Sequence, residues 1–278
     1  MANPLERLRP PRPDSHTFEP YLTVEIRDRL GALELDVSFQ LSKAWTVLFG
    51  PSGSGKTTIL RSIAGLHRPD DAVIVAHSMK YSTIPAAVLT DTANRIHLPP
   101  HQRSIPLVPQ SPCLFPHMTV LENINYRTPG VIGPGEQDYW EILNEKLPPM
   151  FSIEKLLGKK PRELSGGEAS RVSLVRTLMA RHKRLLLLDE PFSGLDTPLR
   201  ASIVYNLLAW QEILSIPIFS VTHDVAEAFQ LGAEVIKIAD GKVVAQGPVE
   251  VVLAEERRRL LAQLREPKSQ NRDMGHPI

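Results

Sequence analysis

A glycine-rich segment that follows an apolar run places the tightest constraint on how this chain can fold. The apolar run is Thr46–Phe49, and residues 50–57 after it read Gly-Pro-Ser-Gly-Ser-Gly-Lys-Thr. Glycines let the backbone curl so that successive N–H groups point inward, and the start of a helix adds a dipole that favours anions. The unit therefore predicts a phosphate-binding loop between a buried strand and a helix. A plain turn with a solvated lysine is the alternative, which this context disfavours.

Each residue type in this loop suits a nucleotide phosphate chain. Lys56 would supply a cation for the β- and γ-phosphates, and Thr57 a hydroxyl for Mg²⁺. We expect a helix from Lys56 to about Ala64, closed by Gly65. The residues predicted to bind the nucleotide here are Gly50, Pro51, Ser52, Gly53, Ser54, Gly55, Lys56, Thr57 and Thr58. The expected cofactors are ATP and Mg²⁺.

A second apolar run ends in two carboxylates. Leu185–Leu188 is followed by Asp189 and Glu190, and ligands bind at the carboxyl ends of strands in open parallel sheets. Asp189 could hold Mg²⁺, and Glu190 could orient or deprotonate an attacking water. Alone, such a run is usually only a strand that meets a loop. Together with the upstream loop, it predicts nucleotide hydrolysis.

The family is indicated by residues 164–168, which read Leu-Ser-Gly-Gly-Glu and are followed by Arg171. This segment resembles the ABC signature sequence, in which a serine and glycine N–H groups at a helix start form an anion site. It also fits a capping box, with Ser165 at the N-cap and Glu168 three residues later. The two interpretations are compatible. Many members of the family have glutamine where this chain has Glu168.

Further family landmarks follow in the expected order. Gln110 resembles the Q-loop glutamine, residues 193–196 (Ser-Gly-Leu-Asp) resemble the D-loop, and His223 resembles the switch histidine. A lone histidine or glutamine is more often an ordinary loop residue, but six ordered landmarks over residues 33–250 make coincidence improbable.

The resemblance implies a head-to-tail dimer of two ATPase chains. Each ATP would lie between the phosphate loop of one chain and Ser165, Gly166 and Gly167 of the other, with Asp196 also at the nucleotide. Glu190 would be the general base. His223 and Gln110 would be catalytic, and the expected metal residues are Thr57, Gln110 and Asp189.

The resemblance and the order of elements together predict an α/β P-loop NTPase of the ABC-ATPase fold. Its central sheet would be mostly parallel, with an antiparallel β subdomain and an inserted helical subdomain at about 111–164. The expected organisation is a Pro-rich irregular tail at 1–20, an ATPase domain at 21–254, and a C-terminal helix and tail at 255–278.

Composition limits where the chain can act. The 32 Lys+Arg nearly balance 31 Asp+Glu, giving a formal net charge of +1, which argues against nucleic acid as a partner. Neither a secretory signal nor an apolar run of about 20 residues is found. Cys113 is the single cysteine, so no internal disulfide can form, which fits a reducing cytosol. In a transporter, the pore would therefore be another chain.

The expected partners are a second ATPase chain in a homodimer, transmembrane permease subunits and, indirectly, a substrate-binding protein. The expected location is peripheral, on the cytoplasmic face of the inner (plasma) membrane. Residues 111–122 would form the groove that receives a permease helix. The alternative is that Leu114 and Phe115 only fill the core of the helical subdomain.

The cargo is suggested only by resemblance. Residues 98–103 and 114–117 look like the corresponding stretches of molybdate-importer ATPases, as does the opening at 24–31, where Leu30 stands in place of an adenine-stacking aromatic residue. Molybdate or a related oxyanion is therefore the expected cargo, and sulfate or polyamine importers are the alternatives. A soluble ABC ATPase without a transport role is a further alternative. Many molybdate-importer ATPases carry a C-terminal oxyanion-binding domain, and we expect none before Ile278.

Overall fold

The computed structural model describes residues 19–79, 84–126, 136–180, 183–231 and 234–265. Within these ranges, eleven strands form one sheet in the order β6-β5-β4-β1-β2-β11-β10-β3-β9-β8-β7. The strands are β1 (Leu22–Leu30), β2 (Leu33–Leu41), β3 (Trp45–Phe49), β4 (Asp71–Ala76), β5 (Ala87–Asp91), β6 (Ile96–His97), β7 (Leu107–Val108), β8 (Leu186–Asp189), β9 (Ile218–Thr222), β10 (Glu234–Ala239) and β11 (Lys242–Pro248).

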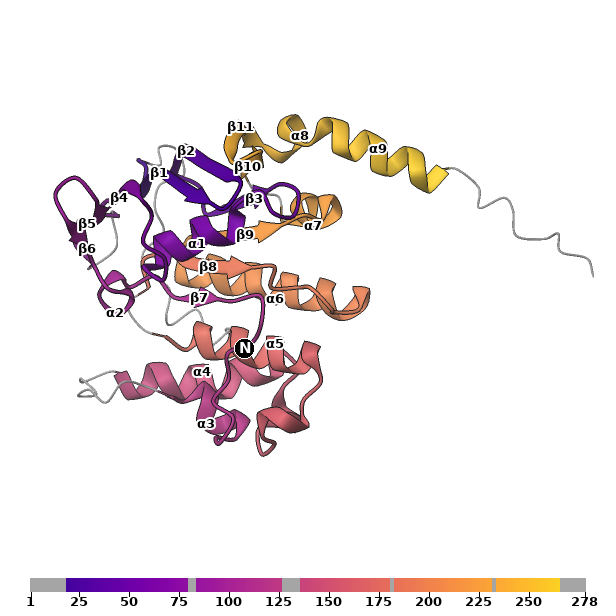
Figure 1. Cartoon of the computed structure of the whole chain (residues 1–278). Coiled ribbons are helices and arrows are strands. Elements are labelled where there is room, and N and C mark those ends of the chain that lie inside the picture. The colour runs from indigo at the N-terminus through magenta and orange to yellow at the C-terminus, as the bar shows by residue number, and fades with distance from the viewer. Residues whose placement is uncertain (1–18, 80–83, 127–135, 181–182, 232–233, 266–278) are drawn as a thin grey trace, which may run out of the picture.

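Helices pack around this sheet, and several of them lie beyond the edge strand β7 (Figure 1). They are α1 (Lys56–Ala64), α2 (Pro100–Arg103), α3 (Val120–Ile124), α4 (Glu136–Met150), α5 (Gly166–Leu178), α6 (Thr197–Leu214), α7 (Val225–Gln230), α8 (Val249–Val252) and α9 (Ala254–Arg265). The predicted helix at Lys56–Ala64 and its closure at Gly65 are confirmed, and Gly65 has the left-handed φ of 80° that favours glycine at this position. None of the helices in the described ranges is both long and apolar enough to span a membrane.

The parallel half of the sheet is buried on both faces. Strands β7, β8, β9, β3 and β10 pair in parallel, and every residue of β3, β8 and β9 is buried. Successive residues of a strand point to opposite faces, so Ile218 joins one hydrophobic cluster and Phe219 the other. A parallel sheet covered on both faces is what uninterrupted apolar runs predict.

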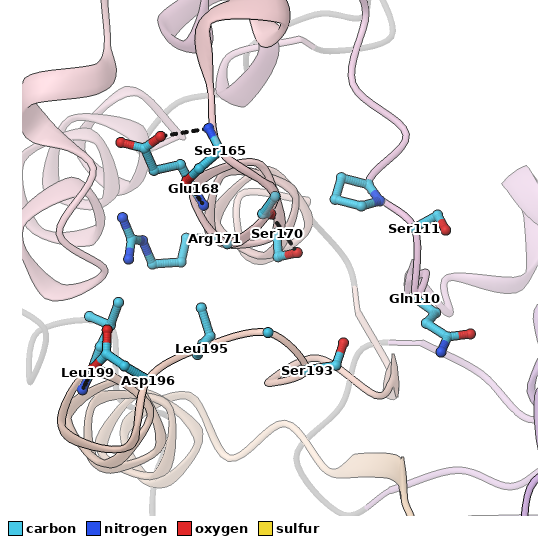
Figure 2. Close-up of a pocket in the computed structure, with 14 residues that line it drawn as sticks. Gln110, Ser111, Ser165, Glu168, Ser170, Arg171, Ser193, Leu195, Asp196 and Leu199 are labelled. Carbon is cyan, nitrogen blue, oxygen red and sulfur yellow. Dashed lines mark hydrogen bonds between the residues drawn. The ribbon is translucent and has the colours of Figure 1, made fainter. Parts of the chain in front are cut away.

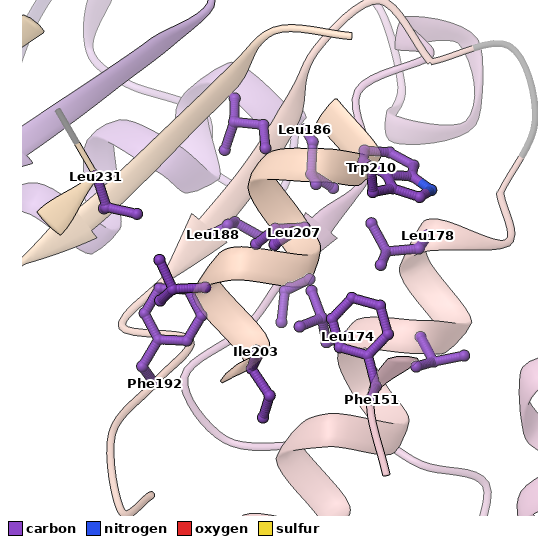
Figure 3. Close-up of a cluster of buried hydrophobic side chains, with 14 of the residues drawn as sticks. Phe151, Leu174, Leu178, Leu186, Leu188, Phe192, Ile203, Leu207, Trp210 and Leu231 are labelled. Atoms are coloured by element: carbon purple, nitrogen blue, oxygen red, sulfur yellow. The ribbon is translucent and has the colours of Figure 1, made fainter. Parts of the chain in front are cut away.

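The two clusters belong to different layers of helices. Figure 3 shows Leu174 and Leu178 of α5 and Trp210 of α6 packed against Leu186 and Leu188 of β8. On the opposite face, α1 packs between the parallel strands and the strands β1, β2 and β4. The helix that follows the glycine-rich loop is therefore clamped between two sets of strands.

The predicted antiparallel subdomain is confirmed, and it continues the same sheet. Strands β2, β1, β4, β5 and β6 pair in antiparallel order. One residue pair, Lys242 with Asp36, joins them to the parallel half through β11.

Helices α3 and α4 lie in the stretch expected to form the helical insertion. Val120 and Ile124 of α3 and Leu143 and Leu147 of α4 are buried in the same cluster as α5. The domain boundaries at 20, 111, 164 and 254 stay predictions. The predicted tails fall largely on residues 1–18 and 266–278, outside the described ranges.

Candidate nucleotide-binding site

The glycine-rich loop connects β3 to α1 and needs its glycines. Gly55 is the N-cap of α1 with φ 94°, and no side chain caps the helix. A Cβ at Gly55 would lie 2.8 Å from Leu35 Cδ1, and one at Gly50 would collide with the carbonyl oxygen of Ile238. The loop is thus a narrow cradle whose helix start remains open to an external anion.

Lys56 lies inside this cradle. Its side chain is buried, and Nζ donates to the carbonyl oxygens of Gly50 at 2.9 Å and Pro51 at 2.7 Å. Burial lowers the pKa of Lys56, while the negative charges of Glu190 and Asp189 oppose that effect. A cation is therefore held at the helix start with only carbonyl oxygens as partners, as phosphate binding requires.

Thr57 and Asp189 meet at the base of the loop. Thr57 Oγ1 donates to Asp189 Oδ1 at 3.2 Å. Burial raises the pKa of Asp189; the Thr57 hydrogen bond counteracts this effect, and the charge of Glu190 adds to it. A hydroxyl beside a desolvated carboxylate fits Mg²⁺, which prefers one or two carboxylates with substrate phosphates over a cage built from protein alone. Indeed, no cluster of three or more His, Cys, Asp or Glu that could hold a metal occurs in the described ranges.

Glu190 lies between the other two predicted catalytic side chains. Gln110 Nε2 donates to Glu190 Oε2 at 3.1 Å, and His223 Nδ1 lies 3.1 Å from Glu190 Oε1. The three residues follow β7, β8 and β9, which are neighbours in the sheet. Glu190 also has a φ of 47°, a strained value for a side chain other than glycine. The fold thus gathers Gln110, Glu190 and His223, which lie far apart in the sequence, around one carboxylate that can accept a proton.

The signature-like residues line a separate cavity of about 920 Å³ (Figure 2). Its walls are the start of α5 at residues 165–168, 170 and 171, the loop at 193–196 with Leu199, and the segment at 110–112. Gly167 lies against Leu195, since a Cβ on Gly167 would be 3.2 Å from Leu195 Cδ2. No residue of the 50–58 loop lines this cavity, so the structure does not bring the two predicted anion sites together within one chain.

Two networks around the site were not predicted from the sequence. Arg200, in α6, donates to Asp224 Oδ2 at 3.1 Å and to the Leu195 carbonyl oxygen at 3.4 Å, which ties the 193–196 loop to the residue after His223. Nearby, Glu227 is buried, and burial raises its pKa to about 7. Only proximity in the fold reveals these contacts.

Arg103 forms the second network and is fully buried. Its guanidinium donates to the carbonyl oxygens of Ser62 at 2.9 Å and Ile63 at 3.1 Å at the end of α1, and to Thr90 Oγ1 at 2.9 Å. Gly65 leaves room for it, because a Cβ there would lie 2.5 Å from Arg103 Nε. Arg103, which lies in α2, therefore links the end of α1 to Thr90 of the antiparallel strand β5.

The predicted docking groove is partly buried. Leu114 packs against the hydrophobic cluster under α5, as the core-filling alternative expects. Phe115 is half-buried, with ring centroids 4.4 Å from exposed Tyr126 and 5.4 Å from the Arg176 guanidinium. The surface at 111–126 therefore has a half-buried part, where Leu114 packs on the core, and an exposed part, where Tyr126 lies against Phe115.

Comparison with known proteins agrees with this geometry. The ABC transporter family model matches residues 35–193. A molybdenum import ATP-binding protein, ModC, of Mesorhizobium japonicum is 40% identical over 83% of this chain and 59% of that protein. The chain thus spans about 60% of the length of the ModC relatives; for example, the match covers 62% of the ModC of Rhizobium etli. A molybdate/tungstate import ATP-binding protein, WtpC, of Archaeoglobus fulgidus is 37% identical, and the match covers 82% of this chain and 87% of that protein.

Solved structures share the fold. A bacterial ABC transporter cassette in a dimeric structure matches with a TM-score of 0.63 at 25% identity, over 82% of this chain and 98% of that one. An ATP-binding subunit of an ABC transporter matches with a TM-score of 0.67 at 22% identity, over 90% of this chain and 100% of that one. This chain therefore belongs to the ABC transporter family, with the fold of its ATP-binding cassettes.

Proposed function

We propose that this chain binds and hydrolyses ATP to drive uptake of molybdate or a related oxyanion through a separate membrane permease. The observation that carries the hydrolytic role is the arrangement of Gln110, Glu190 and His223 beside the Thr57–Asp189 pair. The oxyanion cargo rests on the relatives, which are named as molybdenum and molybdate/tungstate import proteins.

In this proposal, the residues of the chain divide the work between binding and proton transfer. Lys56 and the loop N–H groups hold the phosphate chain, and Thr57, Asp189 and Gln110 hold Mg²⁺, which supplies charge neutralisation when bound. Glu190 accepts a proton from the attacking water. His223 and Gln110 orient that carboxylate, and both already lie 3.1 Å from its oxygens.

The second half of each site comes from another copy of the chain. The support is that residues 165–167 line a cavity without any residue of the 50–58 loop, so each anion site has only half the expected contacts. Ser165, Gly166, Gly167 and Asp196 would then face the nucleotide held by the partner. Closing on ATP and opening after hydrolysis would supply the conformational work.

The permease would dock on residues 111–122, where Phe115 and nearby Tyr126 present an aromatic edge. The chain would then act at the cytoplasmic face of the plasma membrane, with a substrate-binding protein delivering the anion on the other side. Sulfate or polyamine importers remain the alternatives for the cargo.

The test is ATP hydrolysis by the complex isolated from its own membranes and reconstituted with its binding protein. We expect molybdate to raise hydrolysis several-fold and sulfate to leave it unchanged; a Glu190→Gln complex serves as the inactive control. Hydrolysis indifferent to molybdate would remove the cargo but keep the ATPase. Recovery of the chain without any membrane partner would overturn the transport role.

A further inference from the structure

The start of α5 is closed by its own side chains. Ser165 Oγ accepts from the N–H of Glu168 at 3.3 Å, and Glu168 Oε2 accepts from the N–H of Ser165 at 2.7 Å. This reciprocal pair is a capping box, and it satisfies two of the four N–H groups that a helix start leaves without partners.

The box selects the donors that remain for a ligand. The N–H groups of Gly166 and Gly167 have no acceptor in the described part of the chain, and both residues line the 920 Å³ cavity. A Cβ on Gly166 would meet nothing within 4 Å, so its backbone faces open space. An incoming phosphate would find two N–H groups and the Ser165 hydroxyl in fixed positions.

The same box puts a negative charge beside those donors. The hydrogen bonds from the main chain and side chain of Ser165 hold the pKa of Glu168 below its ordinary range, so the carboxylate is ionised at neutral pH. Lys159 and Arg171 lower that pKa only as smaller effects. An anion that approaches the helix start therefore meets a fixed carboxylate as well as favourable N–H groups.

We propose that Glu168 is a positioning residue that orders the α5 donors and weakens their hold on ATP carried by a second copy of the chain. The proposal rests on the proposed function and assigns Glu168 two separable effects. Its hydrogen bond fixes the loop and supports turnover. Its charge repels the phosphate and raises the ATP concentration needed to close the dimer.

Helix α3 supplies a matched control. There, Thr119 Oγ1 accepts from the Glu122 N–H at 3.2 Å, and Glu122 Oε2 accepts from the Thr119 N–H at 2.6 Å. The pKa of Glu122 is also held low, chiefly by its hydrogen bonds to Thr119. This box has the same chemistry but does not line the cavity of the signature-like residues.

The experiment measures kcat and KM for ATP of the full-length chain assayed without the permease, because Glu122 lies in the proposed docking segment at 111–122. The variants are Glu168→Gln, Glu168→Ala, Glu122→Gln and Glu122→Ala. Glutamine keeps the acceptor and removes the charge, so we expect Glu168→Gln to lower KM about threefold at unchanged kcat. High salt should shrink that difference, because it screens the charge. Glu168→Ala should lower kcat about fivefold through the lost cap, and Gln should rescue kcat where Ala does not. Both Glu122 variants should keep the wild-type KM.

Other outcomes separate the failures. An unchanged KM in Glu168→Gln, or the same KM shift in Glu122→Gln, would overturn the role of Glu168 and leave the ATPase intact. A wild-type chain that does not hydrolyse ATP would instead overturn the proposed function itself. Glu168→Gln is nearly isosteric, so the KM result stands even where the alanine variant fails to fold.

Discussion

The helix starts of α1 and α5 are both predicted to bind ATP phosphates, each in a different copy of the chain, but they are built in opposite ways. At α1 a glycine in the left-handed region is the N-cap, no side chain caps the helix and no acid occurs in the first turn. At α5 a serine is the N-cap, and an acid in the first turn completes a capping box. Buried Lys56 stands at the first start, whereas Ser165 at the second is exposed.

The difference in N-cap and charge predicts strong phosphate binding at the start of α1 and weaker phosphate binding at the start of α5. At α1 the N–H groups, a cation and a clamped backbone all act on one phosphate chain, with α1 fastened at its far end by Arg103. At α5 half of the free donors are already bonded within the helix, and the added charge has the wrong sign for an anion. We infer that the start of α1 supplies most of the affinity for ATP and that the start of α5 contacts ATP only when the dimer closes.

The largest expected effect separates chemistry from binding at both helix starts. We expect Glu190→Gln to lower turnover about 1,000-fold, because the proton acceptor is lost, while ATP still binds. The amide can keep the contact with Gln110 but no longer accepts a proton. ATP-driven dimer formation in this variant would then report the two helix starts without hydrolysis. Undiminished steady-state hydrolysis would sink the assignment of Glu190.

Substitutions at Lys56 and Ser165 should have smaller effects, and they should show which of the two helix starts contributes more to ATP binding. Lys56→Ala should weaken ATP binding on the order of 100-fold, since charge-assisted bonds to phosphate contribute about 2–3 kcal/mol. Ser165→Ala should weaken ATP-driven dimer formation only about fivefold, through a lost hydroxyl contact and N-cap. Nucleotide titration by calorimetry and dimer formation by sedimentation measure the two effects in the Glu190→Gln background. Equal losses in the two variants would contradict the inference that the start of α1 supplies most of the affinity for ATP.

Glycine substitutions test whether the two backbones differ as described. Gly55 has φ 94° and no room for a Cβ, whereas Gly166 has open space around it. Gly55→Ala should lower the free energy of unfolding by about 2 kcal/mol. Gly166→Ala should leave it unchanged or raise it by up to about 1 kcal/mol, because alanine favours the helix. Urea unfolding measures both, and a costly Gly166→Ala would mean that the α5 start is also constrained.

The residues that would contact the nucleotide were easier to predict from the sequence than the contacts that hold those residues in place. Residues 50–57 and Asp189 could be found because a loop or a carboxylate beside an apolar run is a local pattern. Arg103 could not be found, because its acceptors are main-chain carbonyls at Ser62 and Ile63, about forty positions away. Likewise, no local pattern shows that the antiparallel strands join the parallel sheet, since the pairing of Lys242 in β11 with Asp36 in β2 connects residues about 200 positions apart.

The contacts of Gln110 and His223 with Glu190 could be predicted only in part. Gln110 and His223 were predicted by resemblance and Glu190 from its place after an apolar run, but the contact of both neighbours with one carboxylate depends on strand order. Strands β7, β8 and β9 adjoin in the sheet, whereas they are far apart along the chain. Strand adjacency is non-local, which is why the residues could be named and their geometry could not.

The smallest expected effect is a difference in the sign of a pH dependence. Burial raises the pKa of Asp189 at the α1 site, so the folded chain holds that proton more tightly than the unfolded chain does. Its contribution to stability is full below the ordinary value of 3.8 and is lost as pH rises through the folded pKa. Asp189→Asn should therefore gain stability relative to wild type as pH rises above 3.8.

Glu168 at the α5 site should behave in the opposite way. Its hydrogen bonds lower its pKa, so it stabilises the fold above the ordinary value of 4.5, and that contribution is lost as pH falls through the folded pKa. Glu168→Gln should be less stable than wild type at neutral pH, and the two should converge in acid. Urea midpoints across the pH range measure both variants, with Glu122→Gln expected to follow Glu168→Gln. Curves of the same sign for Asp189→Asn and Glu168→Gln would mean that the two anion sites are not electrostatic opposites, and the division between strong and weaker binding would then have no electrostatic basis.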